Sequence, residues 1–175
     1  MTQECLGLKF ENVFAMPNKR TFTIKPIADL ITSENGWRFD EPFPFEYKID
    51  ALDHLWTFRD NSLDGVLFDP PYSPRQLKEC YDSIGQSWDG TSGIWSQWEA
   101  RIASVIKPGG KCIKFGWNSH KIRKDFETTR ILLVNHGGHH NDTIVTVQKK
   151  MNQTLCDYCF DRYGTMSFCY CEEES

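Results

Sequence analysis

The chain has 175 residues, with a hydrophobic content of 39% and an aromatic content of 14%. This composition is typical of one globular domain with a sizeable core and excludes a disordered chain. No apolar run approaches the length of a membrane span, and the first residues lack the basic start and apolar stretch of a secretory signal. The protein is therefore predicted to be cytoplasmic, with no membrane partner.

The formal net charge of −4 is unfavourable for a nucleic-acid-binding protein, but the charges are unevenly distributed. The segment 34–69 and the extreme C-terminus are acidic. The segment 101–130 instead carries eight lysines and arginines against Asp125 and Glu127. It is interpreted either as a basic face on an acidic protein or as an ordinary solvated surface.

The apolar pattern predicts alternating helices and strands. In chain order these are an extended piece and helix at 21–31, a strand at 47–49, a helical turn at 51–56, a buried strand at 65–68, helices at 76–84 and 93–106, a strand at 111–115, a helix at 120–129, and strands at 131–134 and 143–149. The Lys-Pro-Gly-Gly segment at 107–110 is expected to end the helix before it. This alternation indicates a doubly wound α/β domain.

The motif Asp69-Pro70-Pro71-Tyr72 directly follows the predicted strand at 65–68. Ligands of open α/β sheets bind at the carboxyl ends of the strands, so these four residues are predicted to be catalytic. An aromatic amine is a poor nucleophile because its lone pair is delocalised into the ring. The Asp69 carboxylate and the Pro70 carbonyl would hold the two amine hydrogens and aim the lone pair at an electrophile. Tyr72 would offer a flat face to an extruded base.

This motif resembles the catalytic motif of amino-group DNA methyltransferases, and in particular that of small phage-type enzymes that methylate N6 of adenine. The resemblance extends to segments 16–27, 69–76, 107–110, 115–119 and 136–143, and covers about residues 14–150. It implies a Rossmann-like fold with a mostly parallel sheet, S-adenosylmethionine as the methyl donor, and DNA as the substrate.

The resemblance also implies roles for further residues by their position. The segment along the methionine part of the cofactor corresponds to Phe22, Thr23, Ile24, Lys25 and Pro26. The acidic position that faces the adenine amino group of the cofactor corresponds to Asp50, which Ala51 follows. The strand end that flanks the target base corresponds to Phe115, Trp117 and Asn118.

The chain departs from the family pattern ahead of Asp50. The family has a glycine-containing loop and a second strand here, whereas Phe39-Asp40-Glu41-Pro42-Phe43-Pro44 contains no glycine. The fold is therefore expected to be truncated around the cofactor glycine loop. The alternatives are a cytosine-N4 or RNA guanine-N2 methyltransferase, or a degenerate, non-catalytic relative that binds DNA or a partner. Without a separate recognition domain, sequence readout would come from the 83–96 loop, the basic segment or a second subunit in a homodimer.

Residues 1–150 are predicted to form the methyltransferase-like domain, and 151–175 a cysteine-rich tail. The tail holds four of the seven cysteines, in a spacing compatible with structural zinc, a thiol cluster or a disordered tail: Cys156, Cys159, Cys169 and Cys171. His136, His139 and His140 lie beside two glycines. They are interpreted as a polar loop between strands, with a metal site as the alternative.

Overall fold

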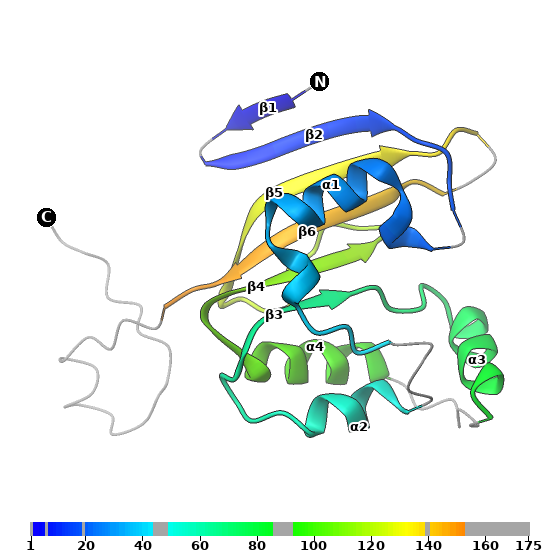
Figure 1. Ribbon diagram of the computed structural model, residues 1–175, viewed down its shortest axis with the longest axis vertical. Helices are drawn as coiled ribbons and strands as arrows, with labels where there is room; N and C mark the ends of the chain where they lie inside the picture. The colour runs from blue at the N-terminus through cyan, green and yellow to red at the C-terminus, as the bar shows by residue number, and fades with distance from the viewer. Residues whose placement is uncertain are drawn as a thin grey trace, which may run out of the picture.

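The computed structural model describes residues 2–5, 7–18, 20–43, 49–85, 93–138 and 141–152. A six-stranded sheet forms the centre of this part of the chain, in the order β1-β2-β5-β6-β4-β3 (Figure 1). Strands β2, β5, β4 and β3 run in one direction, and β1 and β6 run in the other. The strands are β1 Thr2–Cys5, β2 Leu8–Phe14, β3 Leu63–Phe68, β4 Ile106–Gly116, β5 Phe126–Asn135 and β6 Thr143–Lys150.

Helices cover both faces of the sheet. Helix α1 packs on one face through Ile27, Leu30 and Ile31, and in Figure 1 it lies across β5 and β6. The other face is covered by the remaining helices, whose largest buried side chain is Trp98. The helices are α1 Lys25–Ser33, α2 Ala51–Trp56, α3 Pro74–Ser83 and α4 Ile94–Val105, with 3-10 turns η1 Thr21–Thr23 and η2 Gly36–Arg38.

The helix starts follow from local side-chain chemistry. Pro26 and Pro74 occupy the first turns of α1 and α3, where a missing N–H leaves no hydrogen bond unmade. The Asp50 carboxylate caps α2 by accepting from the backbone of the first turn, and the Ser73 hydroxyl caps α3 in the same way. These caps fix where α2 and α3 begin relative to β3.

Strand β3 is buried on both sides and ends at the predicted catalytic motif. Val66 and Phe68 face the α4 side, and Leu67 faces α1. Beyond β3, the described residues continue the sheet as a single parallel bridge, in which the Asp40 N–H donates to the Gly65 carbonyl and the Leu67 N–H donates to the Asp40 carbonyl. Residues 39–43 thus stand beside β3 where a full strand would otherwise pair.

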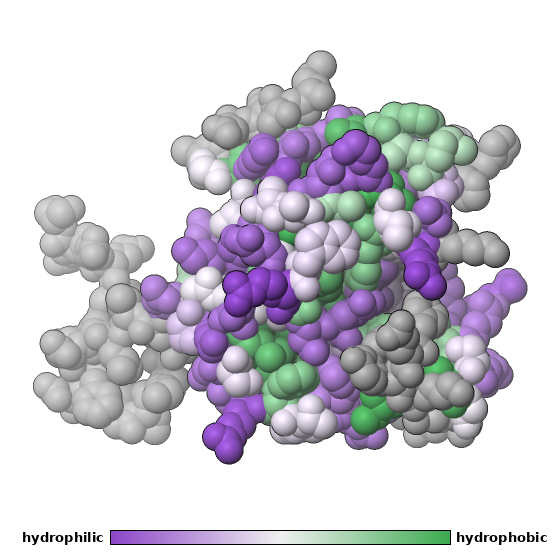
Figure 2. All heavy atoms as spheres, in the orientation of Figure 1, coloured by the Kyte–Doolittle hydropathy of each residue, from purple (hydrophilic) through white to green (hydrophobic). Residues whose placement is uncertain are grey.

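The predicted α/β fold, with a sheet covered on both faces, is confirmed. Four of the six strands run in one direction, but the sheet is mixed, because β1 and β6 make three of the five strand pairings antiparallel. The predicted helix at 93–106 and the strands at 65–68, 111–115, 131–134 and 143–149 are present, several with longer bounds. The extended piece expected before α1 is the 3-10 turn η1. No described helix is long and apolar enough to cross a membrane, and hydrophilic side chains cover much of the face in Figure 2.

The helix predicted at 120–129 is wrong. This segment is an irregular crossover that leads into β5, with Ile122 buried and its N–H bonded to the Gln148 side chain. Thr128 and Thr129 are β-branched and favour the extended conformation that they adopt in β5. Strands β1 and β2 are additions that the sequence interpretation did not include. The strand predicted at 47–49 lies largely outside the described residues.

Candidate active site

Asp69 lies at the carboxyl end of β3, where the sequence predicts a site. Its carboxylate accepts hydrogen bonds from the Tyr72 hydroxyl and from the side chain of Thr21. Among the described residues no lysine, arginine or histidine forms an ion pair with it. Burial raises the pKa of Asp69 above its ordinary value, and the two hydrogen bonds offset only part of that effect. The Asp69 carboxyl group is therefore largely shielded from water, and no cation among the described residues balances its charge.

Two aromatic rings from different loops meet beside this carboxylate. Tyr72 follows β3 and Trp117 follows β4, and their ring centroids lie 5.3 Å apart with an interplanar angle of 53°. Trp117 remains 46% exposed, so one face of this pair is open to solvent. Burial and the neighbouring Asp69 raise the pKa of Tyr72, which keeps its hydroxyl a donor. The predicted catalytic residue and the predicted base-flanking residue are thus in contact.

Two side chains hold the backbone of the predicted catalytic motif. The Trp95 indole N–H donates to the Pro71 carbonyl at 3.0 Å, and the Tyr72 N–H donates to the Gln76 side chain at 2.8 Å. Pro70 is buried. The sequence analysis did not identify Trp95. This residue lies on α4, 24 residues after Pro71, and no local sequence pattern connects the two.

The segment expected along the cofactor lies on the α1 side of Asp69. Phe22 packs against Phe115, with ring centroids 5.0 Å apart, and Ile24 is buried. Thr23 and Lys25 face solvent; Lys25 forms an ion pair with Asp29. Of this segment, Thr21 and Phe22 make the contacts that link it to the site, while Ile24 and Pro26 set the start of α1.

Asp50 lies at the start of α2 and is already hydrogen-bonded through both carboxylate oxygens. One oxygen caps α2, and the other accepts from the Tyr81 hydroxyl of α3. Burial, followed by this hydrogen bond, raises the pKa of Tyr81. The neighbouring Ala51 is buried in the core. A ligand at Asp50 would have to replace the Tyr81 contact.

Phe115 and Asn118 lie close to the candidate site but have different surroundings. Phe115 has no exposed surface and supports Phe22 from within the core. Asn118 is exposed, and its side-chain oxygen contacts His120. Among the three residues expected to flank a base, only Trp117 places a large ring at the surface next to Asp69.

The segment that replaces the glycine loop is packed against the protein. Asp40 is bonded through its carboxylate to the His54 Nε2 atom at 3.1 Å. Phe43 packs on Phe68 and edge-on against Trp98, with ring centroids 5.9 and 4.8 Å apart. These contacts hold Asp40 and Phe43 partly buried against the rest of the domain.

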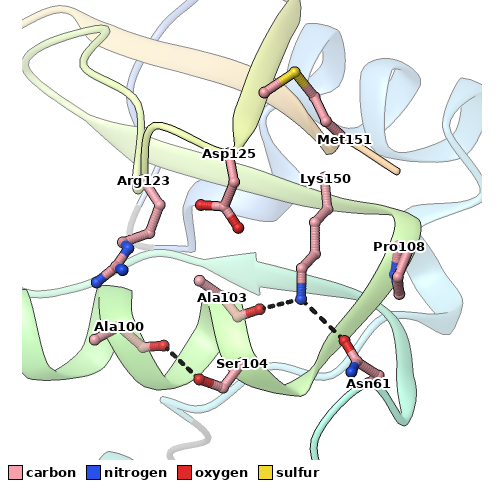
Figure 3. Close-up of a pocket in the computed structure, with 9 residues that line it drawn as sticks. All are labelled: Asn61, Ala100, Ala103, Ser104, Pro108, Arg123, Asp125, Lys150 and Met151. Atoms are coloured by element: carbon pink, nitrogen blue, oxygen red, sulfur yellow. Dashed lines mark hydrogen bonds between the residues drawn. The ribbon is translucent and has the colours of Figure 1, made fainter. Parts of the chain in front are cut away.

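Two cavities in the described part of the chain lie at the other end of β3 and β4. One has a volume of about 270 Å³ between the end of α4 and β6. Figure 3 shows Lys150 pointing into it and donating to the Asn61 side chain and the Ala103 carbonyl. The other, of about 420 Å³, lies beside residues 107–111 at the start of β4. Neither is lined by Asp69 or Tyr72.

The predicted histidine loop has a structural anchor. His136 is 5% exposed; its Nδ1 atom contacts the Ala15 carbonyl at 2.7 Å, and its Nε2 atom contacts the Thr143 hydroxyl at 2.9 Å. It thereby ties the β5–β6 turn to the end of β2. The described residues contain no group of three or more potential metal ligands. His139, His140 and the four tail cysteines lie outside the described residues.

No protein-family model and no curated protein sequence matches the chain. Among solved structures, the chain is similar to TrmN from Thermus thermophilus, with 19% identity over 57% of this chain and 26% of that one, and a TM-score of 0.38. It is also similar to yhhF from Escherichia coli, a proposed methyltransferase, with 8% identity over 59% and 46% of the two chains and a TM-score of 0.31. The chain therefore spans less than half the length of either protein, and likenesses this distant carry no argument about its activity.

Proposed function

We propose that the protein transfers a methyl group from S-adenosylmethionine to the exocyclic amino group of a base in DNA, specifically N6 of adenine. The observation that carries this proposal is the Asp69 carboxyl group at the end of β3. It accepts from the Tyr72 hydroxyl, whose ring packs against Trp117, and it has no ion-pair partner in the described structure. An acceptor of hydrogen bonds next to flat apolar faces suits an extruded base that carries an amino group.

The chain's own residues would hold and aim the amine. The Asp69 carboxylate and the Pro70 carbonyl would each accept one N–H, which directs the nitrogen lone pair away from the ring plane. Tyr72 and Trp117 would stack on the base and keep it out of the duplex. When bound, the cofactor supplies a methyl group that is already activated by a sulfonium, so no nucleophilic side chain is required. Catalysis would then come from positioning and electrostatics.

Two parts of the chain would hold the cofactor. Residues Phe22 to Ile24 follow Thr21, whose side chain contacts Asp69, so this segment reaches the reacting end. Asp50 offers a carboxylate to an adenine amino group once Tyr81 releases it. The Asp50 carboxylate is an acceptor of the kind that an adenine amino group needs, which supports S-adenosylmethionine.

The choice of adenine in DNA rests on the family resemblance of the sequence. The amine-holding chemistry applies equally to cytosine N4 and to guanine N2 in RNA, because each is an amino group on an aromatic ring. The base that accepts the methyl group is therefore identified by analysing the methylated nucleoside, and not by the geometry of Asp69.

A non-catalytic protein that binds nucleic acid is the second candidate. The contacts that favour it are those of Asp50 with Tyr81, of Asp40 with His54 and of Asp69 with Tyr72, which occupy three carboxylates near the proposed site. Calorimetry with S-adenosylmethionine separates the two candidates. Saturable binding supports the enzyme, and no binding at millimolar cofactor supports the second candidate.

The direct test is transfer of a radiolabelled methyl group to unmethylated DNA and RNA, followed by nucleoside analysis. We expect N6-methyladenine in DNA with the wild-type protein and none with Asp69→Ala. The control is Asp29→Ala, which removes an exposed carboxylate on α1 and should retain full activity. Transfer that persists in Asp69→Ala contradicts the proposed role.

A further inference from the structure

The two aromatic rings beside Asp69 are carried by loops that do not share a strand. Tyr72 belongs to the loop after β3, and Trp117 belongs to the loop after β4. A base stacked between them needs the two rings about 7 Å apart, since each stacked contact takes about 3.5 Å. The ring centroids now lie 5.3 Å apart, so one loop must move relative to the other before a base can enter. The position of one loop relative to the other therefore decides whether a base fits.

The first loop is tied to α4 through Trp95. Its indole N–H donates to the carbonyl of Pro71, the residue directly before Tyr72. The Trp95 ring is itself braced edge-on against Trp98, which is fully buried, with centroids 5.8 Å apart. Movement of the Tyr72 loop away from α4 would break this bond.

The second loop is tied to α4 through Glu99. Its carboxylate accepts from Lys114 at 2.8 Å, in an ion pair whose side chains are only 16% and 6% exposed. It also lies 2.9 Å from the Nε2 atom of His120, and that same nitrogen lies 2.5 Å from Lys114. Lys114 precedes Trp117 and His120 follows it, so Glu99 holds this loop on both sides of the ring.

Trp95 and Glu99 are four residues apart on α4, which places them on one face about 6 Å apart along the axis. We propose that these two side chains are positioning residues that set the gap between Tyr72 and Trp117. Neither would touch the base. A single rigid helix would hold both loops, so a shift at either contact changes the same gap. The expected effect on the rate of methyl transfer rests on the proposed function. The expected effect on the position of Trp117 does not.

The test uses Trp95→Phe, which keeps a ring and removes the N–H, and Glu99→Gln, which keeps the shape and removes the charge. Each has a matched control at a distance from the site. Trp37→Phe removes an indole bond to Thr32, of 2.8 Å. Glu34→Gln removes the charge from a carboxylate that is 17% exposed and paired with Lys111.

The structural measurement is the fluorine NMR spectrum of protein labelled with 5-fluorotryptophan, with the Trp117 line assigned from Trp117→Phe. We expect Trp95→Phe and Glu99→Gln to shift or broaden that line, and the two controls to leave it unchanged. The kinetic measurement is kcat for methyl transfer, expected to fall about tenfold or more in both variants, with an unchanged Kd for the cofactor.

The outcomes separate the two ideas. A Trp117 line that moves in both variants supports the positioning role even if the wild-type protein transfers no methyl group, a result that would remove the proposed function. An unmoved Trp117 line, together with kcat values equal to those of the controls, overturns the positioning role and leaves the proposed function intact.

Discussion

Asp69 occupies surroundings that favour its uncharged form, yet the proposed reaction uses its carboxylate. Burial raises its pKa, and the hydrogen bonds from Tyr72 and Thr21 are the groups that lower it. A raised pKa means that the folded state holds the proton more tightly than the unfolded state does. Ionisation of Asp69 at neutral pH therefore reduces the free energy of unfolding.

Asp69→Asn should stabilise the protein while abolishing methyl transfer. The amide keeps the shape and an oxygen that accepts from Tyr72, but carries no buried charge. The gain in Tm should be largest at neutral pH, and should shrink as the pH falls through the folded pKa of Asp69 toward the unfolded value of about 4. Thermal unfolding of both proteins across this range checks the sign. A gain in Tm that is largest at acidic pH would contradict the idea that the buried charge of Asp69 destabilises the folded state.

The residues of the site differ in how far the sequence reveals them. Asp69 to Tyr72 stand out because a motif follows an apolar strand directly. Trp95 and Glu99 have no such signal, since they meet Pro71 and Lys114 only after the chain has folded. The same holds for His136, whose contacts with Ala15 and Thr143 depend on the pairing of three strands.

Among the elements, those with a local pattern were predictable. Strand β3 is a compact apolar run, and α4 repeats its apolar side chains at helical spacing. The segment 120–129 misled because its polar residues allow a helix, while pairing of β5 with β2 and β6 decides otherwise. The conformation of residues 39–43, beside β3, is determined by close packing. A periodic pattern of apolar residues does not reveal such packing.

Gly65 is the element-scale test of that packing. A Cβ atom there would lie 2.7 Å from both the Lys111 carbonyl and the Phe39 ring. Gly65→Ala should therefore lower the free energy of unfolding by about 1–3 kcal/mol. Gly138→Ala is the matched control, because nothing lies within 4 Å of its added Cβ. Urea denaturation of both variants measures the difference, and equal midpoints would refute the crowding.

At the scale of the whole molecule, the pattern of charge is more informative than its sum. Most described lysines and arginines form ion pairs, as Lys78 does with Asp82. Lys121, on the exposed crossover four residues after Trp117, forms none among the described residues. An unpaired cation that follows an exposed aromatic ring suits a phosphate backbone next to a stacked base. Arg123 also has no ion pair in this part of the chain, but it lines the cavity at the other end of β4.

The variant Lys121→Ser should weaken DNA binding at low salt. The slope of log K against log salt should fall by about 1 for the lost phosphate contact. Lys78→Ser is the control, because its cation is already paired with Asp82. Fluorescence anisotropy over a series of salt concentrations gives both slopes. An unchanged slope in Lys121→Ser would place the DNA elsewhere.

The single bridge at Asp40 has a consequence for solubility. Strand β3 has the apolar composition of an interior strand, yet it is the last strand of the described sheet. Interior-type strands left open at a margin invite pairing with other molecules. The short segment from Phe39 to Phe43 lies along part of this margin, so loosening it should expose β3 and favour self-association.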